Sequence, residues 1–255
     1  METVQQTVLK LPRPARDALD GVWLGAPLHP ALTDVPLGSW TAMAVLDLVG
    51  SDAADAALLI GVLAALPTAL TGLNDWSHLK GEPRRVGVVH ALVNATGLCL
   101  NVGSLLVRRR GRRGLGRLLS AVAYAGTLYS AHLGGQLSFR LGVRVDRTAF
   151  EDEPEEWTPI AAADDVGADL RRFDDVLVTR SASGELCAIA ATCSHLGGPL
   201  EEGEREGDTV VCPWHGSRFD LCTGAVEGGP AVFPQPRYEA RVRDGNVEIR
   251  AAKDA

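Results

Sequence analysis

The sequence predicts two folded parts: an N-terminal all-α membrane bundle of four transmembrane helices and a C-terminal all-β domain. In the first half, three long runs free of charged side chains follow one another. In the second half, short apolar or β-branched runs alternate with Gly, Asp and Ser turns. A chain of 255 residues is long enough for both parts. We expect an N-terminal segment at 1–24, the membrane domain at 25–145, an acidic linker at 146–156 and the β domain at 157–252.

The uncharged runs predict the membrane helices. They cover residues 56–73, 86–107 and 118–139, and each is about as long as a helix that crosses a hydrocarbon core of about 30 Å. A fourth, shorter run at 35–50 contains Asp47. Buried helices of a soluble protein are the alternative, but three such runs in succession favour a multi-pass protein of the cell membrane.

The distribution of Lys and Arg bears on the orientation of this bundle. Four spans place both ends of the bundle on one side, and the larger number of Lys and Arg residues lies there. The densest group, residues 108–117, lies in a single loop on the opposite side. The number of Lys and Arg residues favours a cytoplasmic β domain, whereas their density in the single loop favours the reverse orientation. We expect the cytoplasmic arrangement.

Histidines in the membrane half form a second candidate site. His90 lies early in one predicted helix and His132 late in the next, so their depths in the bilayer are similar. Ionisable residues inside a membrane tend to face the bundle and to be functional. A b-type haem, a metal or a quinone bound at His90 and His132 is one interpretation. Histidines satisfied by interfacial hydrogen bonds are the alternative.

The region after the bundle predicts a linker and then strands. Residues 151–156 are nearly all acidic and predict a solvated linker. Asp244-Gly245-Asn246 predicts a tight hairpin turn. Short apolar runs predict strands at 176–178, 186–189, 209–211 and 247–249.

Two short loops carry the chemistry of the β domain. One holds Cys193 and His195 as C-x-H, and the other holds Cys212 and His215 as C-x-x-H, with sixteen residues between His195 and Cys212. Two cysteines and two histidines are the ligand set of a Rieske [2Fe–2S] centre, in which imidazoles replace two thiolates on one iron and raise the reduction potential. A zinc site is the alternative, but Cys₂His₂ zinc sites usually place both cysteines before both histidines.

At these residues the chain resembles a known family. Residues 157–250 resemble a Rieske domain of the ferredoxin type, and the run from Cys212 to Asp220 is close to the form that this family uses. The resemblance implies that Cys193 and Cys212 bind the buried iron of a [2Fe–2S] cluster. It implies that His195 and His215 bind the exposed iron, in an antiparallel β fold.

Two further stretches carry resemblances. The segment Gly228-Gly229-Pro230, with Pro234 and Pro236, resembles the proline-containing loop that shields the cluster in Rieske domains. Residues 25–145 resemble a four-helix bacterial membrane domain of unknown function that occurs fused to Rieske domains. The matching features are His29-Pro30, Pro36, His90 and His132-Leu133-Gly134-Gly135.

The cluster loops depart from the cytochrome bc type of Rieske protein. Gly198 and Trp214 stand where that type has two further cysteines joined by a disulfide, and Phe219 stands where it has a tyrosine that bonds a ligand sulfur. Ser217, whose hydroxyl bonds a cluster sulfide in the family, is present. Fewer hydrogen bonds to sulfur predict a low or intermediate potential. The missing disulfide suits a reducing compartment. The other cysteines are expected to be small buried hydrophobes: Cys99, Cys187 and Cys222.

These features predict a membrane-anchored Rieske electron-transfer protein. It would pass single electrons between a membrane carrier, such as a quinone, and a redox protein or reductase. A redox-sensing or regulatory membrane protein, and the electron-donor component of a Rieske-type oxygenase system, are the alternatives. An oxygenase active site is not expected, because its mononuclear iron needs two further histidines and none follows His215. The net charge of −7 argues against nucleic acid as a partner.

Overall fold

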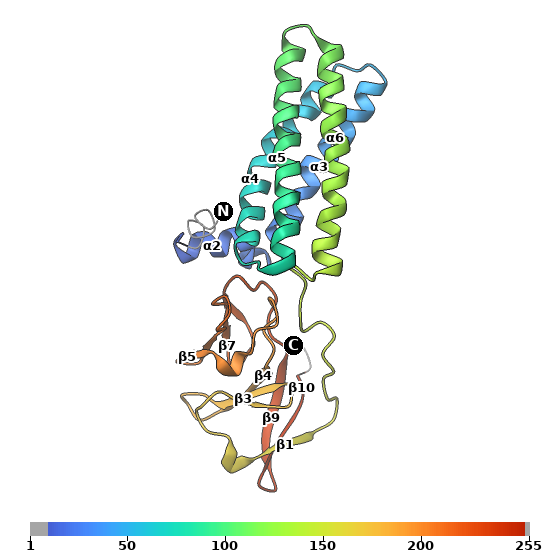
Figure 1. Ribbon diagram of the computed structural model, residues 1–255. Coiled ribbons are helices and arrows are strands. Elements are labelled where there is room, and N and C mark those ends of the chain that lie inside the picture. The colour runs from blue at the N-terminus through green and yellow to red at the C-terminus, as the bar shows by residue number, and fades with distance from the viewer. Residues whose placement is uncertain (1–9, 253–255) are drawn as a thin grey trace. The chain divides into compact units, whose positions relative to one another are not determined.

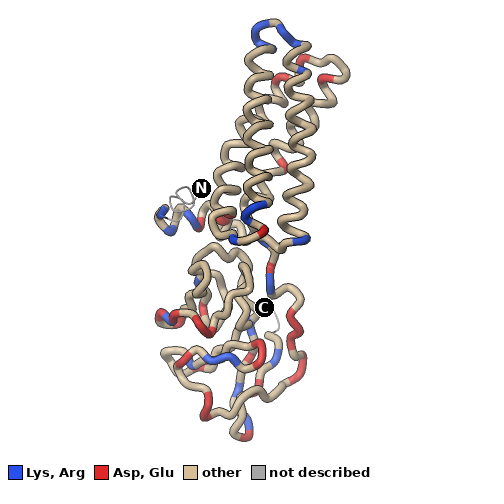
Figure 2. Tube along the Cα trace, viewed as in Figure 1, with Lys and Arg blue, Asp and Glu red and all other residues tan. Residues whose placement is uncertain are grey.

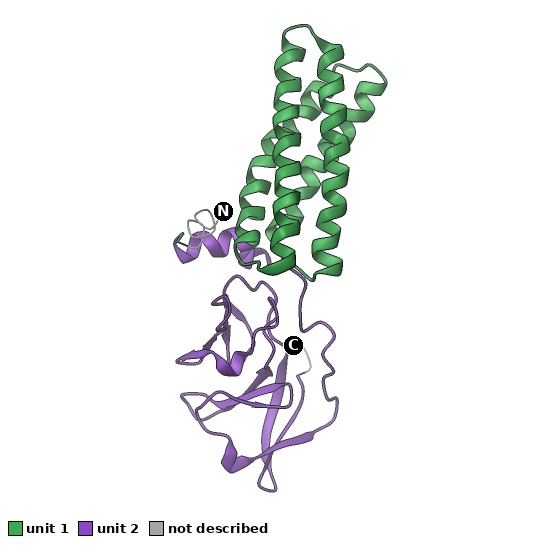
Figure 3. Ribbon diagram, viewed as in Figure 1, with its two compact units in different colours: residues 1–11, 27–143 green, residues 12–26, 144–255 purple. Residues whose placement is uncertain are grey.

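The computed structural model describes residues 10–252, which form two compact units (Figure 3). The helical unit holds residues 27–143 together with 10 and 11, and the β unit joins residues 12–26 to residues 144–252. We expected residues 1–24 to form a segment of their own. The structure instead places residues 12–24 in the β unit, and residues 1–9 lie outside the described residues.

Within residues 27–143, four long helices run side by side (Figure 1). They are α3 (Leu28–Leu48), α4 (Ala54–Ser77), α5 (Gly81–Arg109) and α6 (Arg113–Gly135), followed by the π-helical turn η2 (Gln136–Arg140). The predicted helical region is confirmed. By length and composition α4 and α5 could cross a membrane, whereas α3 and α6 do not reach the same measure. Four membrane spans therefore stay a prediction.

A close glycine contact and a buried ion pair join helices of the bundle. Trp40 of α3 lies against Gly61 of α4, where a Cβ would overlap the indole ring. Arg108, at the end of α5, is buried and donates to Asp47 of α3 at 2.8 Å and to Asp55 of α4 at 2.9 Å. This ion pair explains how the apolar run at 35–50 accommodates a carboxylate.

Residues 158–251 form two antiparallel sheets. The larger has the order β1-β10-β9-β4-β3-β2 and the smaller the order β5-β6-β7-β8. All four predicted strands are present, within β3, β4, β6 and β10. The predicted hairpin is confirmed too, since Asp244 (φ 50°) and Gly245 (φ 79°) join β9 to β10. The strand bounds are β1 (Thr158–Ala162), β2 (Arg171–Phe173), β3 (Val176–Arg180), β4 (Leu186–Ala190), β5 (Glu204–Glu206), β6 (Thr209–Val211), β7 (Arg218–Asp220), β8 (Val226–Gly228), β9 (Arg237–Arg243) and β10 (Asn246–Ala251).

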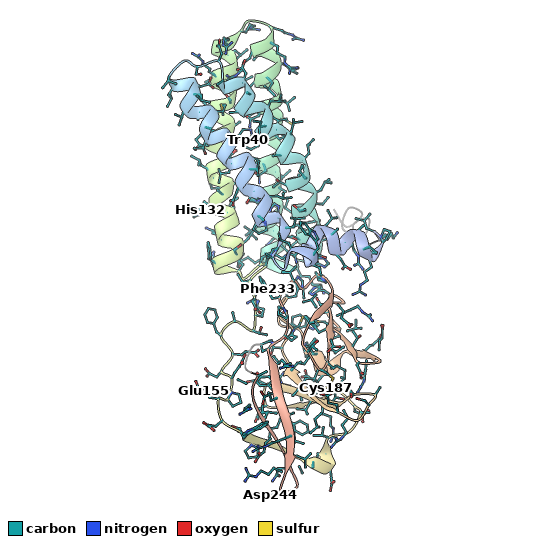
Figure 4. The ribbon with its side chains drawn as sticks, turned by 180° about the vertical axis from the view of Figure 1, so that it is seen from behind. Trp40, His132, Glu155, Cys187, Phe233 and Asp244 are labelled. Carbon is teal, nitrogen blue, oxygen red and sulfur yellow. A yellow bond between two sulfur atoms is a disulfide. The ribbon has the colours of Figure 1, made fainter. Side chains whose placement is uncertain are left out.

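The expectation for two of the cysteines was wrong. Cys187 of β4 and Cys222, just after β7, form a disulfide (Cys187 is labelled in Figure 4). The two Cα atoms lie 4.4 Å apart although 35 residues separate them in the sequence. Their approach depends on how the two sheets pack, which no local pattern reveals. Cys99, also expected to be buried, is exposed on α5.

The acidic segment is not a solvated linker along its whole length. The backbone N–H of Arg147 donates to the carbonyl of Ser194 at 2.9 Å, and Thr148 is buried. The carbonyl of Pro154 accepts from the N–H of Ala251 at 2.7 Å. Side chains 152, 153, 155 and 156 are exposed, as expected. Backbone hydrogen bonds fasten this segment to the β unit, and acidic composition does not predict them.

Candidate metal centre

Two similar turns hold the four predicted ligands. The first loop, 193–199, leads from β4 into the short helix η4 (Leu200–Glu202), and the second, 212–217, joins β6 to β7. In each, the cysteine N–H donates to the carbonyl five residues on at 2.8 Å, and the cysteine carbonyl accepts from the glycine four residues on. Those glycines, Gly197 and Gly216, have φ values of 78° and 76°, which suit glycine. The C-x-H and C-x-x-H spacings therefore share one backbone design.

The two thiols lie beneath these turns. Cys193 and Cys212 are 1% and 3% exposed. Two backbone N–H groups of each loop are directed at that loop's own cysteine sulfur. A hydrogen bond between the thiols raises the pKa of Cys193, to which burial adds, and lowers the pKa of Cys212 to about 7. Donors around a buried sulfur stabilise the thiolate, which is the form that binds metal.

The two imidazoles lie beside each other, with Trp214 next to them. The ring centroids of His195 and His215 are 5.2 Å apart and their planes are nearly perpendicular. His195 is buried, His215 is half-buried, and Trp214 is 54% exposed. A Cβ at Gly198 would lie 2.8 Å from the Cys212 sulfur and 3.2 Å from the Trp214 ring. The glycine thus makes room for the sulfur of the opposite loop.

The donor set fits a two-iron cluster. The thiols pair with each other, and the imidazoles pair with each other. A [2Fe–2S] centre with two cysteines on one iron and two histidines on the other needs this arrangement.

A proline-containing loop, residues 229–236, is hydrogen-bonded to both ligand loops. The N–H of Ala231 donates to Ser217 Oγ at 3.0 Å. Ser194 Oγ donates to the carbonyl of Phe233 at 2.8 Å (Figure 4). Because Ser217 Oγ accepts a bond here, its own proton is directed elsewhere. Phe219 is fully buried in the same core as Cys193 and Cys212, so it supplies packing without a hydroxyl.

Sequence reasoning missed a helix that belongs to this site. Helix α2 (Arg13–Asp20) packs on the proline-containing loop, where Asp17 accepts from the N–H of Gly229 at 3.0 Å. A signal for it was available. Pro14 lies in the first turn of the helix and Gly21, with φ 89°, follows its end, which is the usual asymmetry of helix ends.

The structure does not support the shared site expected at His90 and His132, because the two histidines have different partners. His132 is exposed on α6, and its Nε2 lies 2.9 Å from the side-chain nitrogen of Gln136 (Figure 4). His90 instead has its Nδ1 2.9 Å from the carbonyl of Ser130, and its ring lies 6.4 Å from that of His29. Similar depth did not bring the two residues together, because depth does not fix the direction of a side chain around the helix axis.

The fold and the loops define the class, an antiparallel β domain with paired Cys/His loops for an iron–sulfur centre. The family model for the Rieske [2Fe–2S] domain matches residues 156–239, and the model described as a predicted membrane protein (DUF2231) matches residues 25–147. The chain belongs to the Rieske [2Fe–2S] family. It is an iron–sulfur electron-transfer protein, and its Rieske domain implies a [2Fe–2S] cluster.

Several known proteins resemble the β unit. Ferredoxin CarAc of Metapseudomonas resinovorans is 31% identical over 102 residues, which cover 38% of this chain and 95% of that protein. The cytochrome b6-f complex iron–sulfur subunit of Chlorobaculum tepidum is 30% identical over 79 residues, or 31% of this chain and 42% of that one. A solved complex of reduced oxygenase and oxidized ferredoxin in carbazole 1,9a-dioxygenase matches with 30% identity and a TM-score of 0.36, covering 39% of this chain and 96% of that chain.

Proposed function

We propose that this chain is a membrane-anchored carrier of single electrons, with Cys193 and Cys212 on one iron of the cluster and His195 and His215 on the other. The pair of matching turns, with thiols buried and imidazoles adjacent, carries this proposal. When bound, the cluster accepts and releases one electron. The buried core keeps water from the thiolates, and His215, the more exposed of the two imidazoles, is the proposed exit for the electron.

The proposed partners are a redox protein or reductase on one side and a membrane carrier, such as a quinone, on the other. Two of the relatives support a protein partner. One is named as the ferredoxin component of a 2,4-dinitrotoluene dioxygenase system and another as a subunit of a cytochrome b6-f complex. Cluster reduction followed by visible circular dichroism, with a quinol in vesicles or with a soluble reductase, distinguishes the two routes.

We place the β unit outside the cytoplasm, against the expectation from the number of Lys and Arg residues. The support is the disulfide between Cys187 and Cys222, because disulfides persist in oxidising compartments. The Arg-rich loop between α5 and α6 (Figure 2) then lies on the cytoplasmic side, as its density favours. The apolar character of α4 and α5 supports the anchoring itself.

Metal analysis and EPR of the purified full-length protein test the cluster. We expect about two irons per chain and the low average g of His-ligated [2Fe–2S] centres. Cys193→Ser and Cys212→Ser should each abolish the signal. Cys99→Ser, which changes an exposed cysteine of α5, is the matched control and should keep it. Stoichiometric zinc without iron would overturn the proposal.

A further inference from the structure

We propose that Asp20 and Arg144 form a clamp that holds the proline-containing loop against the cluster site and thereby raises the reduction potential. The inference rests on the proposed cluster site. Both residues lie outside residues 156–239, the stretch matched by the Rieske model. Asp20 ends α2, and Arg144 begins the segment that follows the helical unit. Two parts of the chain that flank the bundle therefore meet on one loop of the β unit.

The clamp is a buried ion pair with a second hydrogen bond. Arg144 Nη2 lies 2.6 Å from Asp20 Oδ1, and the two side chains are 5% and 2% exposed. Arg144 Nη1 donates to the carbonyl of Pro230 at 2.7 Å. A planar guanidinium can donate to two acceptors at once, which the single ammonium of lysine does poorly. Burying two charges is unfavourable unless their hydrogen bonds are satisfied. We therefore expect the ion pair and the hydrogen bond to Pro230 to form together.

Helix α2 packs closely on the same loop. A Cβ at Gly229 would lie 2.8 Å from Asp20 Oδ2 and 3.3 Å from Asp17 Oδ1. At the other end of the helix, Arg13 Nη2 donates to the carbonyl of Gly216 in the second ligand loop at 3.4 Å. The helix therefore contacts both the proline-containing loop and a ligand loop.

One hydrogen bond links the clamp to the ligands. Pro230, which Arg144 holds, is followed by Ala231, whose N–H donates to Ser217 Oγ at 3.0 Å. The carbonyl of Ser217 accepts from the N–H of Cys212 at 2.8 Å. The bond from Ala231 orients the Ser217 hydroxyl, and a hydroxyl that donates to cluster sulfur stabilises the reduced state. Releasing Pro230 loosens this orientation and weakens the hydrogen bond to sulfur, so the reduction potential falls.

The test compares reduction potentials of full-length variants by EPR-monitored titration. Asp20→Leu combined with Arg144→Met replaces the pair by apolar side chains without changing the net charge, which buried ion pairs often tolerate. We expect retained iron and a lower potential. In a Ser217→Ala background the same double change should produce a much smaller shift, because both act through one hydrogen bond. The matched control, Arg241→Met with Glu248→Leu, removes a pair between β9 and β10 and should leave the potential unchanged.

An unchanged potential with the cluster in place, or an equal shift in both backgrounds, would overturn the clamp. If the double variant does not bind iron, Arg144→Lys decides the question, since it keeps the charge but loses the fork to Pro230, and we expect a lower potential again. Loss of iron from both variants, with the control intact, would also overturn it, because the clamp is assigned to the potential and not to ligand binding. A wild-type protein without a Rieske EPR signal would contradict the proposed function instead.

Discussion

At the scale of single residues, Gly198 shows how a missing side chain makes room for a ligand. A Cβ there would come within 2.8 Å of the Cys212 sulfur, which cannot move without leaving its proposed iron. Gly198→Ala should therefore lose most of its iron, measured by metal analysis and visible absorbance. Gly167→Ala is the control, because its Cβ would meet nothing within 4 Å. If Gly198→Ala binds as much iron as the wild type, the loop can move enough to accommodate the added Cβ, and the prediction is wrong.

Phe219 sets a second expectation, for the potential. Its ring is fully buried beside both cysteines and carries no hydroxyl. Without that donor, the centre should titrate in the lower half of the range of about −150 to +300 mV seen for Rieske centres. Phe219→Tyr should raise the potential in an EPR titration, because it adds a hydroxyl donor to the core that holds both cysteines. A wild-type value near the top of the range contradicts this reasoning.

At the scale of elements, the segment after the helical unit carries a titratable group. Burial raises the pKa of Glu151 to about 7, while a hydrogen bond with Thr192 opposes the rise and nearby Asp175 and Asp146 add to it. The folded protein thus holds a proton that the unfolded chain releases near its ordinary pKa of 4.5. The stabilisation is complete below about pH 4.5 and is lost as the pH rises through about 7.

Glu151→Gln should remove this pH dependence. The unfolding temperature of the wild type, followed by the visible circular dichroism of the cluster, should fall relative to that of the variant between pH 5 and 7. Above pH 7 the two curves should run parallel. Parallel curves over the whole range would mean that Glu151 titrates as in the unfolded chain.

The buried Arg108 makes a prediction about the helical bundle. Its side chain is 1% exposed and bonds Asp47 of α3 and Ser120 of α6. Removing one partner of a buried pair typically costs about 3–5 kcal/mol, because the other charge stays buried. Arg108→Ala should lower the unfolding temperature of the helices in detergent, measured by far-ultraviolet circular dichroism. Arg109→Ala, at an exposed position, should not.

At the scale of the whole molecule, the disulfide links folding to compartment. In protein taken from native membranes, denaturation without reductant should leave two cysteines, Cys187 and Cys222, protected from a maleimide reagent, and reduction should release them. Cys187→Ser should abolish the difference. Equal labelling with and without reductant would return the β unit to the cytoplasmic side, where thiols stay reduced.

The two parts and the Rieske domain were predictable because their signals are local, and the same local signals support the proposed ligand residues. Apolar runs indicate burial or a membrane, and short apolar runs between turns indicate strands. Cys193 and His195 lie only two residues apart, so their spacing is visible in the sequence. The Asp244-Gly245 turn followed from its own φ requirement. Helix α2 could have been predicted too, because Pro14 in its first turn and Gly21 after its last turn mark its ends.

The sequence by itself determined the helical and β parts and the class of cluster, and it supplied the proposed ligand residues, since each depends on spacing along a few turns or strands. Only the tertiary structure decided the disulfide at Cys187, the different partners of His90 and His132, and the meeting of Asp20 with Arg144. These contacts join residues far apart in the chain, and they depend on how strands register and how side chains point around a helix. The local sequence does not determine strand register or side-chain direction, because both depend on packing that involves the whole core.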